Sequence, residues 1–167
     1  MTDRIDSTGL LLCRKQAEIF EASLTQVNCS SAVFLRRYMR SGFAARMDER
    51  TWPLESGSVK DVFMEIEKEF GPTEYGVIRY SAEELYWMGY ICRYWSYTRD
   101  YTSKQIYKII KPKDLRDLYF PFHSLDPANA IDRILEARGI AEKDFTAEGV
   151  KILRRIIQNR TQSRLLY

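Results

Sequence analysis

Histidine and cysteine are scarce in this chain, and their scarcity excludes several kinds of site. One of the 167 residues is histidine and three are cysteine. Cys13, Cys29 and Cys92 are odd in number and far apart, so they supply neither a disulfide framework nor a CxxC metal or redox site. His123 has no second histidine beside it, and the chain lacks both an H-E-x-x-H motif and a glycine-rich phosphate loop. We therefore expect no metal, no cofactor, and cysteines buried as small hydrophobic residues.

Long hydrophobic runs are also missing. The longest run near the N-terminus covers residues 10–13, which is too short for a signal peptide or a membrane span. We expect a cytoplasmic protein that does not associate with a membrane. The formal net charge of +3 is too small to identify a nucleic-acid-binding protein by itself.

Nothing in the composition marks a domain boundary, because repeats, low-complexity tracts and glycine/serine linkers are all absent. Hydrophobic residues make up 45% of the chain, as in ordinary globular proteins. We predict one helical domain over residues 1–167. If it is subdivided, the expected parts are N-terminal helices over 1–71, an aromatic-rich helical region over 72–140 and a basic helix within 141–167.

Apolar residues recur every three or four positions through much of the chain, and this spacing predicts helices. The expected helices cover residues 10–27, 31–42, 59–70, 82–98, 104–110, 114–120 and 127–138, with a last one after Thr146. Pro112 and Pro121 are expected to halt two of them. Residues 75–80 alone have strand-like composition, and they are few enough to be an extended connection. The fold class is therefore all-α.

The clearest local signal is the S-x-x-E spacing of Ser81 and Glu84, which predicts a capping box at the start of a helix. The helix that follows, to about Thr98, carries tyrosine, tryptophan and methionine around almost its whole circumference. A helix that is apolar on all sides is buried on most of them. We predict a compact multi-helix bundle around this central helix at about 82–98.

Arg116 and His123 are the one pair that suggests chemistry. Ribonucleases of the HEPN class use an arginine and a histidine on one helix, where imidazole transfers protons and guanidinium neutralises phosphate charge. Pro121 lies between the two residues and interrupts the helix that would align them. We therefore expect no catalytic residues, a structural role for His123 and no enzymatic activity, with a HEPN-like ribonuclease or toxin as the alternative.

Basic residues are concentrated in two parts of the chain, residues 93–116 and the expected last helix after Thr146. Residues 93–116 contain seven lysines or arginines against two aspartates, interleaved with tyrosines, and could follow a phosphate backbone. The two short helices expected over 102–118 are compatible with a helix-turn-helix motif, and the alternative function is a regulator that binds a DNA operator. The residues of this alternative are Lys104, Lys108, Lys111, Lys113, Lys151, Arg154 and Arg155. A solvated surface or an acidic protein partner is favoured, because the net charge is modest and no specific motif is present.

Arg36, Arg37 and Arg40 form a third candidate. Like charges three and four positions apart repel each other on a helix, so the cluster calls for an anionic counterpart. Residues 61–84 carry seven carboxylates against two basic residues and could supply it within the molecule. Intramolecular pairing is slightly favoured over a partner site.

Two stretches of the sequence resemble known bacterial proteins. The region 85–134 resembles small uncharacterised proteins often encoded beside ADP-ribosyltransferase-like toxins, in particular through LYFPFHSLD at 118–126 followed by AIDRI at 130–134. CSSAVFLRRYMRSGFAARMD at 29–48 resembles the N-terminal part of longer proteins of the same general kind. Together they cover under half of the chain, and Phe122 stands where an aliphatic residue or tyrosine often precedes the histidine.

The resemblance implies an antitoxin, a helical protein that folds against a cognate toxin protein and blocks its active site. It implies that His123 and Asp126 are turn residues ahead of a helix, and it carries over no catalytic residue. Tyrosine, tryptophan and arginine dominate interface energetics, and this chain is rich in all three. We expect the partner-binding residues to be Arg36, Arg37, Arg40, Tyr97 and Tyr101.

Overall fold

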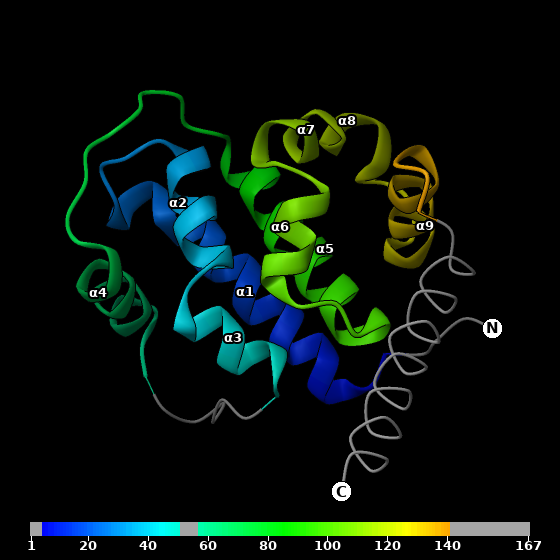
Figure 1. Cartoon of the computed structure of the whole chain (residues 1–167), viewed down its shortest axis with the longest axis horizontal. Coiled ribbons are helices and arrows are strands. Elements are labelled where there is room, and N and C mark those ends of the chain that lie inside the picture. Colours follow the sequence, from blue (N-terminus) through cyan, green and yellow to red (C-terminus); the bar gives the residue numbers. More distant parts are fainter. Residues whose placement is uncertain (1–4, 51–56, 141–167) are drawn as a thin grey trace, which may run out of the picture. The chain divides into compact units, whose positions relative to one another are not determined.

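The computed structural model describes residues 5–50 and 57–140, and within these ranges it contains nine helices and no strand (Figure 1). The helices are α1 (Ser7–Gln26), α2 (Ser31–Met39), α3 (Gly42–Asp48), α4 (Val59–Phe70), α5 (Ala82–Arg99), α6 (Ser103–Ile109), α7 (Pro112–Asp117), α8 (Tyr119–Phe122) and α9 (Pro127–Ala137). The predicted all-α fold is confirmed. Residues 75–80 form an extended connection.

The chain divides into two compact units, Met1–Ala130 and Ile131–Tyr167. The division falls inside α9, whereas the sequence suggested divisions after residues 71 and 140. In the second unit, Ile131, Ile134 and Leu135 form the buried stripe predicted for α9. The basic helix expected within 141–167, with Lys151, Arg154 and Arg155, lies outside the described residues. All of the sites below belong to the first unit.

The first unit is built on the pairing of α1 with α5, which is more extensive than any other helix pair in the described residues. Gly89 of α5 permits the close approach, because a Cβ atom there would lie 2.8 Å from the carbonyl oxygen of Gln16 and 2.9 Å from Cα of Ala17. α5 also contacts α6, α7 and α8. Its predicted central position is therefore confirmed, and so is the capping box of Ser81 and Glu84.

Aromatic rings join the N-terminal helices to one another. Phe20 of α1 packs edge-on against Phe34 and Tyr38 of α2, and Phe34 packs against Phe63 of α4. α2 ends at Met39 and does not reach Gly42 as predicted. The reason is the side chain of Ser41, which accepts a hydrogen bond from Ala44 N and begins α3.

Of the two prolines, Pro112 acts as predicted, because α6 ends at Ile109, before it. Pro112 also stands at the first position of α7, where its missing N–H is not needed. Pro121 does not halt a helix as predicted. Pro121 lies inside α8, within a first turn that likewise requires no donor from it. Thr102, not Ser103, caps α6. The three cysteines are buried, as predicted.

A polar network crosses the centre of this unit. Arg93 of α5 is 1% exposed, although the sequence places it in the basic stretch 93–116. Its Nε and Nη2 atoms donate to Gln16 Oε1 at 2.9 and 2.7 Å, and Nη1 donates to Asp48 Oδ1 at 2.8 Å. Asp48 also accepts hydrogen bonds from the backbone N–H and the hydroxyl of Ser103. The network ties α1, α3, α5 and α6 together.

Tyr38 extends this network to α2. Its hydroxyl donates to Gln16 Oε1 at 2.9 Å, and Gln16 Nε2 donates to the carbonyl of Gly89 at 2.9 Å. Burial raises the pKa of Tyr38, which keeps its hydroxyl protonated as a donor. We refer to Gln16, Tyr38, Asp48, Arg93 and Ser103 as the buried network.

Candidate interaction surface

Arg116 and His123 lie on different short helices. Arg116 belongs to α7, whereas His123 is the residue that ends α8. The Nε atom of Arg116 donates to Glu84 Oε2 at 3.0 Å, and its guanidinium lies 4.5 Å from the ring centroid of Tyr80. The arginine therefore holds α7 against the start of α5.

The imidazole of His123 is exposed and turned back on its own helix. Its Nδ1 atom lies 2.9 Å from the carbonyl oxygen of Tyr119 and 3.1 Å from that of Phe120. The ring also stacks on Tyr119 with centroids 4.6 Å apart. These are the contacts of a residue that completes a helix end.

The three arginines of α2 separate into two groups. Arg37 donates to the carbonyls of Phe70 and Gly71 and lies over the Phe70 ring, so it caps the C-terminus of α4. Its intramolecular counterpart is thus the end of a helix and not a carboxylate. Arg36 and Arg40 are exposed, and the side chain of neither forms an ion pair or hydrogen bond with another described residue.

The two tyrosines expected to contact a partner are engaged within the fold. Tyr101 is only 8% exposed and packs against Trp95, which corrects the expectation of an exposed contact. Tyr97 donates its hydroxyl to Asp6 at 2.8 Å, and the guanidinium of Arg50 lies 3.9 Å from its ring centroid. Tyr97 therefore joins the start of α1 to the end of α3.

The loop over residues 71–81, between α4 and α5, is the most unusual surface of this unit. Backbone hydrogen bonds run from Ser30 N to Tyr75 O at 3.0 Å and from Ser31 N to Ile78 O at 3.1 Å. Gly76 has a φ of 85°, and a Cβ atom there would lie 2.4 Å from Ser30 Oγ. The first turn of α2 therefore holds the loop in one conformation.

Arg79 fixes the other side of the loop. Its Nη2 atom donates to the carbonyls of Leu24 and Val27 at 2.7 and 2.9 Å, at the C-terminus of α1. Helix ends carry unpaired carbonyls and partial negative charge, which a guanidinium satisfies. The loop is thus attached to both α1 and α2.

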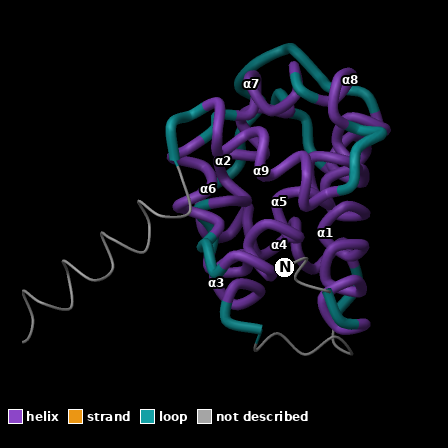
Figure 2. Tube along the Cα trace, turned by 90° about the vertical axis from the view of Figure 1, so that its right-hand side faces the viewer, coloured by secondary structure: helices purple, strands orange, loops and turns teal. Residues whose placement is uncertain are grey.

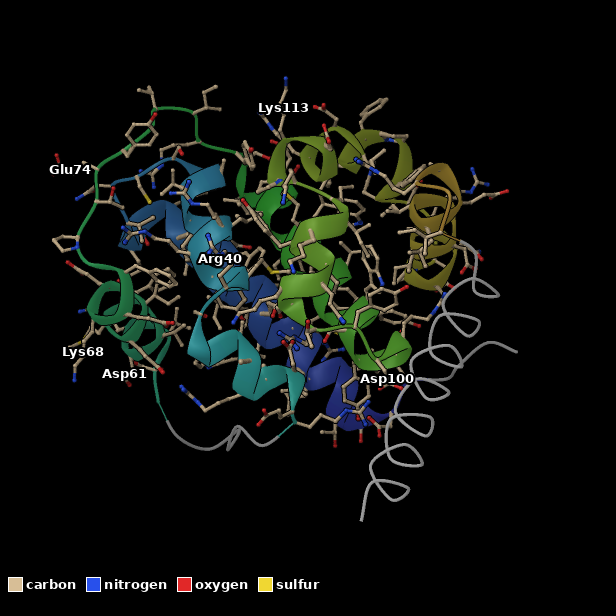
Figure 3. All side chains as sticks on the ribbon, viewed as in Figure 1. Arg40, Asp61, Lys68, Glu74, Asp100 and Lys113 are labelled. Atoms are coloured by element: carbon tan, nitrogen blue, oxygen red, sulfur yellow. The ribbon has the colours of Figure 1, made fainter. Side chains whose placement is uncertain are left out.

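Apolar side chains nevertheless point to solvent from this fixed backbone. Val77 is 90% exposed, Tyr75 76% and Ile78 66%. We call these three residues the apolar tip. Figure 3 shows Glu74, the residue before the tip, on the outer side of the same loop. Exposed apolar side chains that follow one another closely on an ordered segment indicate a site of interaction.

A pocket of about 300 Å³ adjoins the apolar tip. Phe34, Phe63 and Ile66 give it apolar walls, while Arg37 and Glu67 add charge. Residues 71–74 of the loop form one side of it. A projecting tip beside a hollow is a shape that can interlock with a partner protein.

The lysines of the DNA-binding alternative are exposed: Lys104, Lys108, Lys111 and Lys113. They lie on and between α6 and α7, so the two tandem helices of that prediction exist. However, α7 has only six residues and exposes Asp114 and Asp117 beside Lys113. Carboxylates at those positions disfavour insertion of α7 into a DNA groove.

Sequence reasoning missed the apolar tip and the burial of Arg93. The signal for the tip was present, since residues 75–78 are apolar yet follow a helix-ending Gly71–Pro72. Within the described ranges, no three side chains of the metal-binding types lie close together, and no helix has the length and apolar character needed to cross a membrane. No family model, curated protein or solved structure matches the chain.

Proposed function

We propose that this protein is an antitoxin-like binding protein that neutralises a cognate bacterial toxin by direct protein–protein contact. The observation that carries the proposal is the apolar tip, which is exposed on a loop that the fold already holds in place. A preorganised loop loses little conformational entropy on binding, and its apolar side chains gain from burial.

Several contacts favour binding over catalysis. Arg116 forms a hydrogen bond with Glu84 and lies over the ring of Tyr80. The imidazole of His123 is hydrogen-bonded to a carbonyl of its own helix. Neither residue lines the pocket beside the apolar tip. A general acid or base needs a position from which it can reach a substrate, together with a partner that stabilises charge.

The resemblance of residues 29–48 and 118–134 supports the class of partner. The proteins that they resemble are often encoded beside ADP-ribosyltransferase-like toxins, so a toxin of that kind, acting in the bacterial cytoplasm, is the proposed target. The first of these stretches contains Ser30 and Ser31, whose N–H groups hold the loop. The start of α2 therefore belongs both to a resembling stretch and to the support of the apolar tip.

The test is co-expression with the product of the gene adjacent to its own. We expect rescue of growth and co-purification of a stable complex. Growth arrest caused by this protein alone and suppressed by the neighbour would overturn the proposal and favour the ribonuclease alternative. In that case, His123→Ala should abolish both RNA cleavage and toxicity.

Two loop variants locate the interface. Val77→Ser together with Ile78→Ser removes the apolar contacts, and we expect loss of both rescue and co-purification. Leu11→Ser with Met64→Ser is the matched control, since it removes two exposed apolar side chains from α1 and α4. Gly76→Ala keeps the apolar tip but places a Cβ against Ser30, so it should weaken binding by disturbing the loop. Equal binding by all variants would place the interface elsewhere.

A further inference from the structure

The structure brings together basic residues that are far apart in the sequence. α2 packs against α6, and the two helices lie side by side in front of α1 in Figure 1 and to its left in Figure 2. Their exposed sides carry the residues that we call the basic face: Arg36, Arg40, Lys104 and Lys108. Lys111 and Lys113 continue it toward α7, where Figure 3 shows Lys113 directed outward.

No carboxylate neutralises this face from within its own helices. Neither α2 nor α6 contains an aspartate or a glutamate. Among the described residues, the four side chains of the basic face form no ion pair and no side-chain hydrogen bond, whereas Arg37, Arg79 and Arg116 all have partners inside the fold. Unpaired like charges on neighbouring helix positions repel and destabilise the folded state slightly. A bound anionic surface would remove this repulsion.

The neighbouring apolar tip determines which anionic surface fits. α2 carries both features, because Ser30 and Ser31 at its start hold the loop, and Arg36 and Arg40 lie further along it. A nucleic-acid backbone offers no apolar surface to cover Val77 and Ile78. A protein does, since its interfaces combine an apolar centre with a charged rim.

We infer that the basic face recognises an acidic surface of the partner protein, next to the apolar site into which the tip docks. This inference rests on the proposed function and adds the chemistry of the partner. The apolar tip contributes buried contact area, and the basic face contributes orientation and the rate of encounter. Binding should therefore weaken as ionic strength rises.

The test uses two probes that need no toxin: poly-L-glutamate, and a short fluorescent duplex DNA of arbitrary sequence. Binding is measured by fluorescence anisotropy at roughly 0.15 M salt. The variant is Arg36→Glu with Arg40→Glu. Its matched control is Lys60→Glu with Lys68→Glu, which makes the same charge change at exposed positions of α4.

We expect the wild type to bind poly-L-glutamate, the α2 variant to bind it about tenfold more weakly, and the control to change little. Equal weakening by both variants would overturn the inference, because the attraction would then be non-specific. Tighter binding of the DNA through Arg36 and Arg40 would also overturn it and favour the operator alternative. Failure of co-expression rescue would contradict the proposed toxin partner, and it would leave the result of the probe measurements unchanged.

Discussion

The buried network and the apolar tip reverse the usual distribution of polarity in a protein. Around Arg93, a charged side chain that is 1% exposed meets hydrogen-bonding partners from three other helices. At the tip, Val77 is 90% exposed without an apolar neighbour to cover it. A buried charge is tolerated only where hydrogen-bonding partners surround it. An exposed apolar group indicates a surface that a binding partner buries.

Residues of the buried network maintain the fold, whereas the side chains of the apolar tip are available to a partner. The buried network connects helices that are distant in sequence, so its loss should lower the free energy of unfolding. The apolar tip is attached to the unit through its backbone, while its side chains are mostly exposed. Replacing those side chains should therefore weaken binding to a partner and leave stability nearly unchanged. Substitutions in the two regions should therefore have opposite consequences for stability and for binding.

The largest effect is expected from Asp48→Ala. Removal of this carboxylate leaves Arg93 buried with an uncompensated charge, and we expect a loss of about 3–5 kcal/mol in the free energy of unfolding. Urea denaturation followed by circular dichroism measures it. The control is Glu49→Ala, the exposed neighbouring carboxylate. Equal stability of the two variants would show that the buried network does not stabilise the fold.

A smaller loss is expected from Gly89→Ala. The new Cβ would lie 2.8 Å from a backbone atom of α1, so the helices must separate, at a cost of about 1–3 kcal/mol. Gly42→Ala in α3 is the matched control, because the nearest atom there is 3.8 Å away. Alanine should be neutral or slightly stabilising at that position. The stability of both variants is measured by thermal unfolding. An increase in stability for Gly89→Ala would contradict the close approach of α1 and α5.

Glu84→Gln should cost roughly 1 kcal/mol at neutral pH, because it removes the charged partner of Arg116. Partial burial favours a higher pKa for Glu84, but hydrogen bonds from Ser81 and Arg116 outweigh burial and lower it below 4.5. A lowered native pKa stabilises the fold above pH 4.5, and this stabilisation is lost as pH falls through the native value.

The difference in unfolding free energy between wild type and Glu84→Gln should therefore shrink on acidification. Urea titrations at several pH values measure it. Glu83→Gln, in the same helical turn but exposed, serves as the control. A difference that stays constant down to the lowest pH would contradict this role of Glu84.

The smallest effect on stability is expected at the apolar tip. Val77→Ser with Ile78→Ser should change the free energy of unfolding by less than about 0.5 kcal/mol, because both side chains are mostly exposed. The same protein should fail to co-purify with the toxin. Loss of stability similar to that of Gly89→Ala would instead mean that the tip packs within the fold.

The sequence predicted the elements whose signals are local. The stripe from Leu10 to Val27 became α1, and the spacing of Ser81 and Glu84 located the start of α5. These predictions succeeded because helix periodicity and caps depend on residues within one or two turns.

The buried network could not be predicted in this way. Arg93 bonds Asp48 and Gln16, which lie 45 and 77 positions away, so its neighbours in sequence give no indication of its partners. The exposure of Val77 is equally non-local, because it depends on Ser31 and Arg79 attaching the loop to other helices. Composition identified an apolar segment, but it did not show whether the side chains of that segment are buried or exposed.

The pairing of α1 with α5 also constrains how the protein folds on the ribosome. α1 emerges before α5, and the helix that covers its apolar side is complete only when Arg99 has been added. Until then, the side chains that meet α5 remain exposed to solvent, and Gln16 lacks its partner Arg93. All of α5 must therefore be synthesised before the main packing step, and we expect nascent α1 to require protection by a chaperone until then.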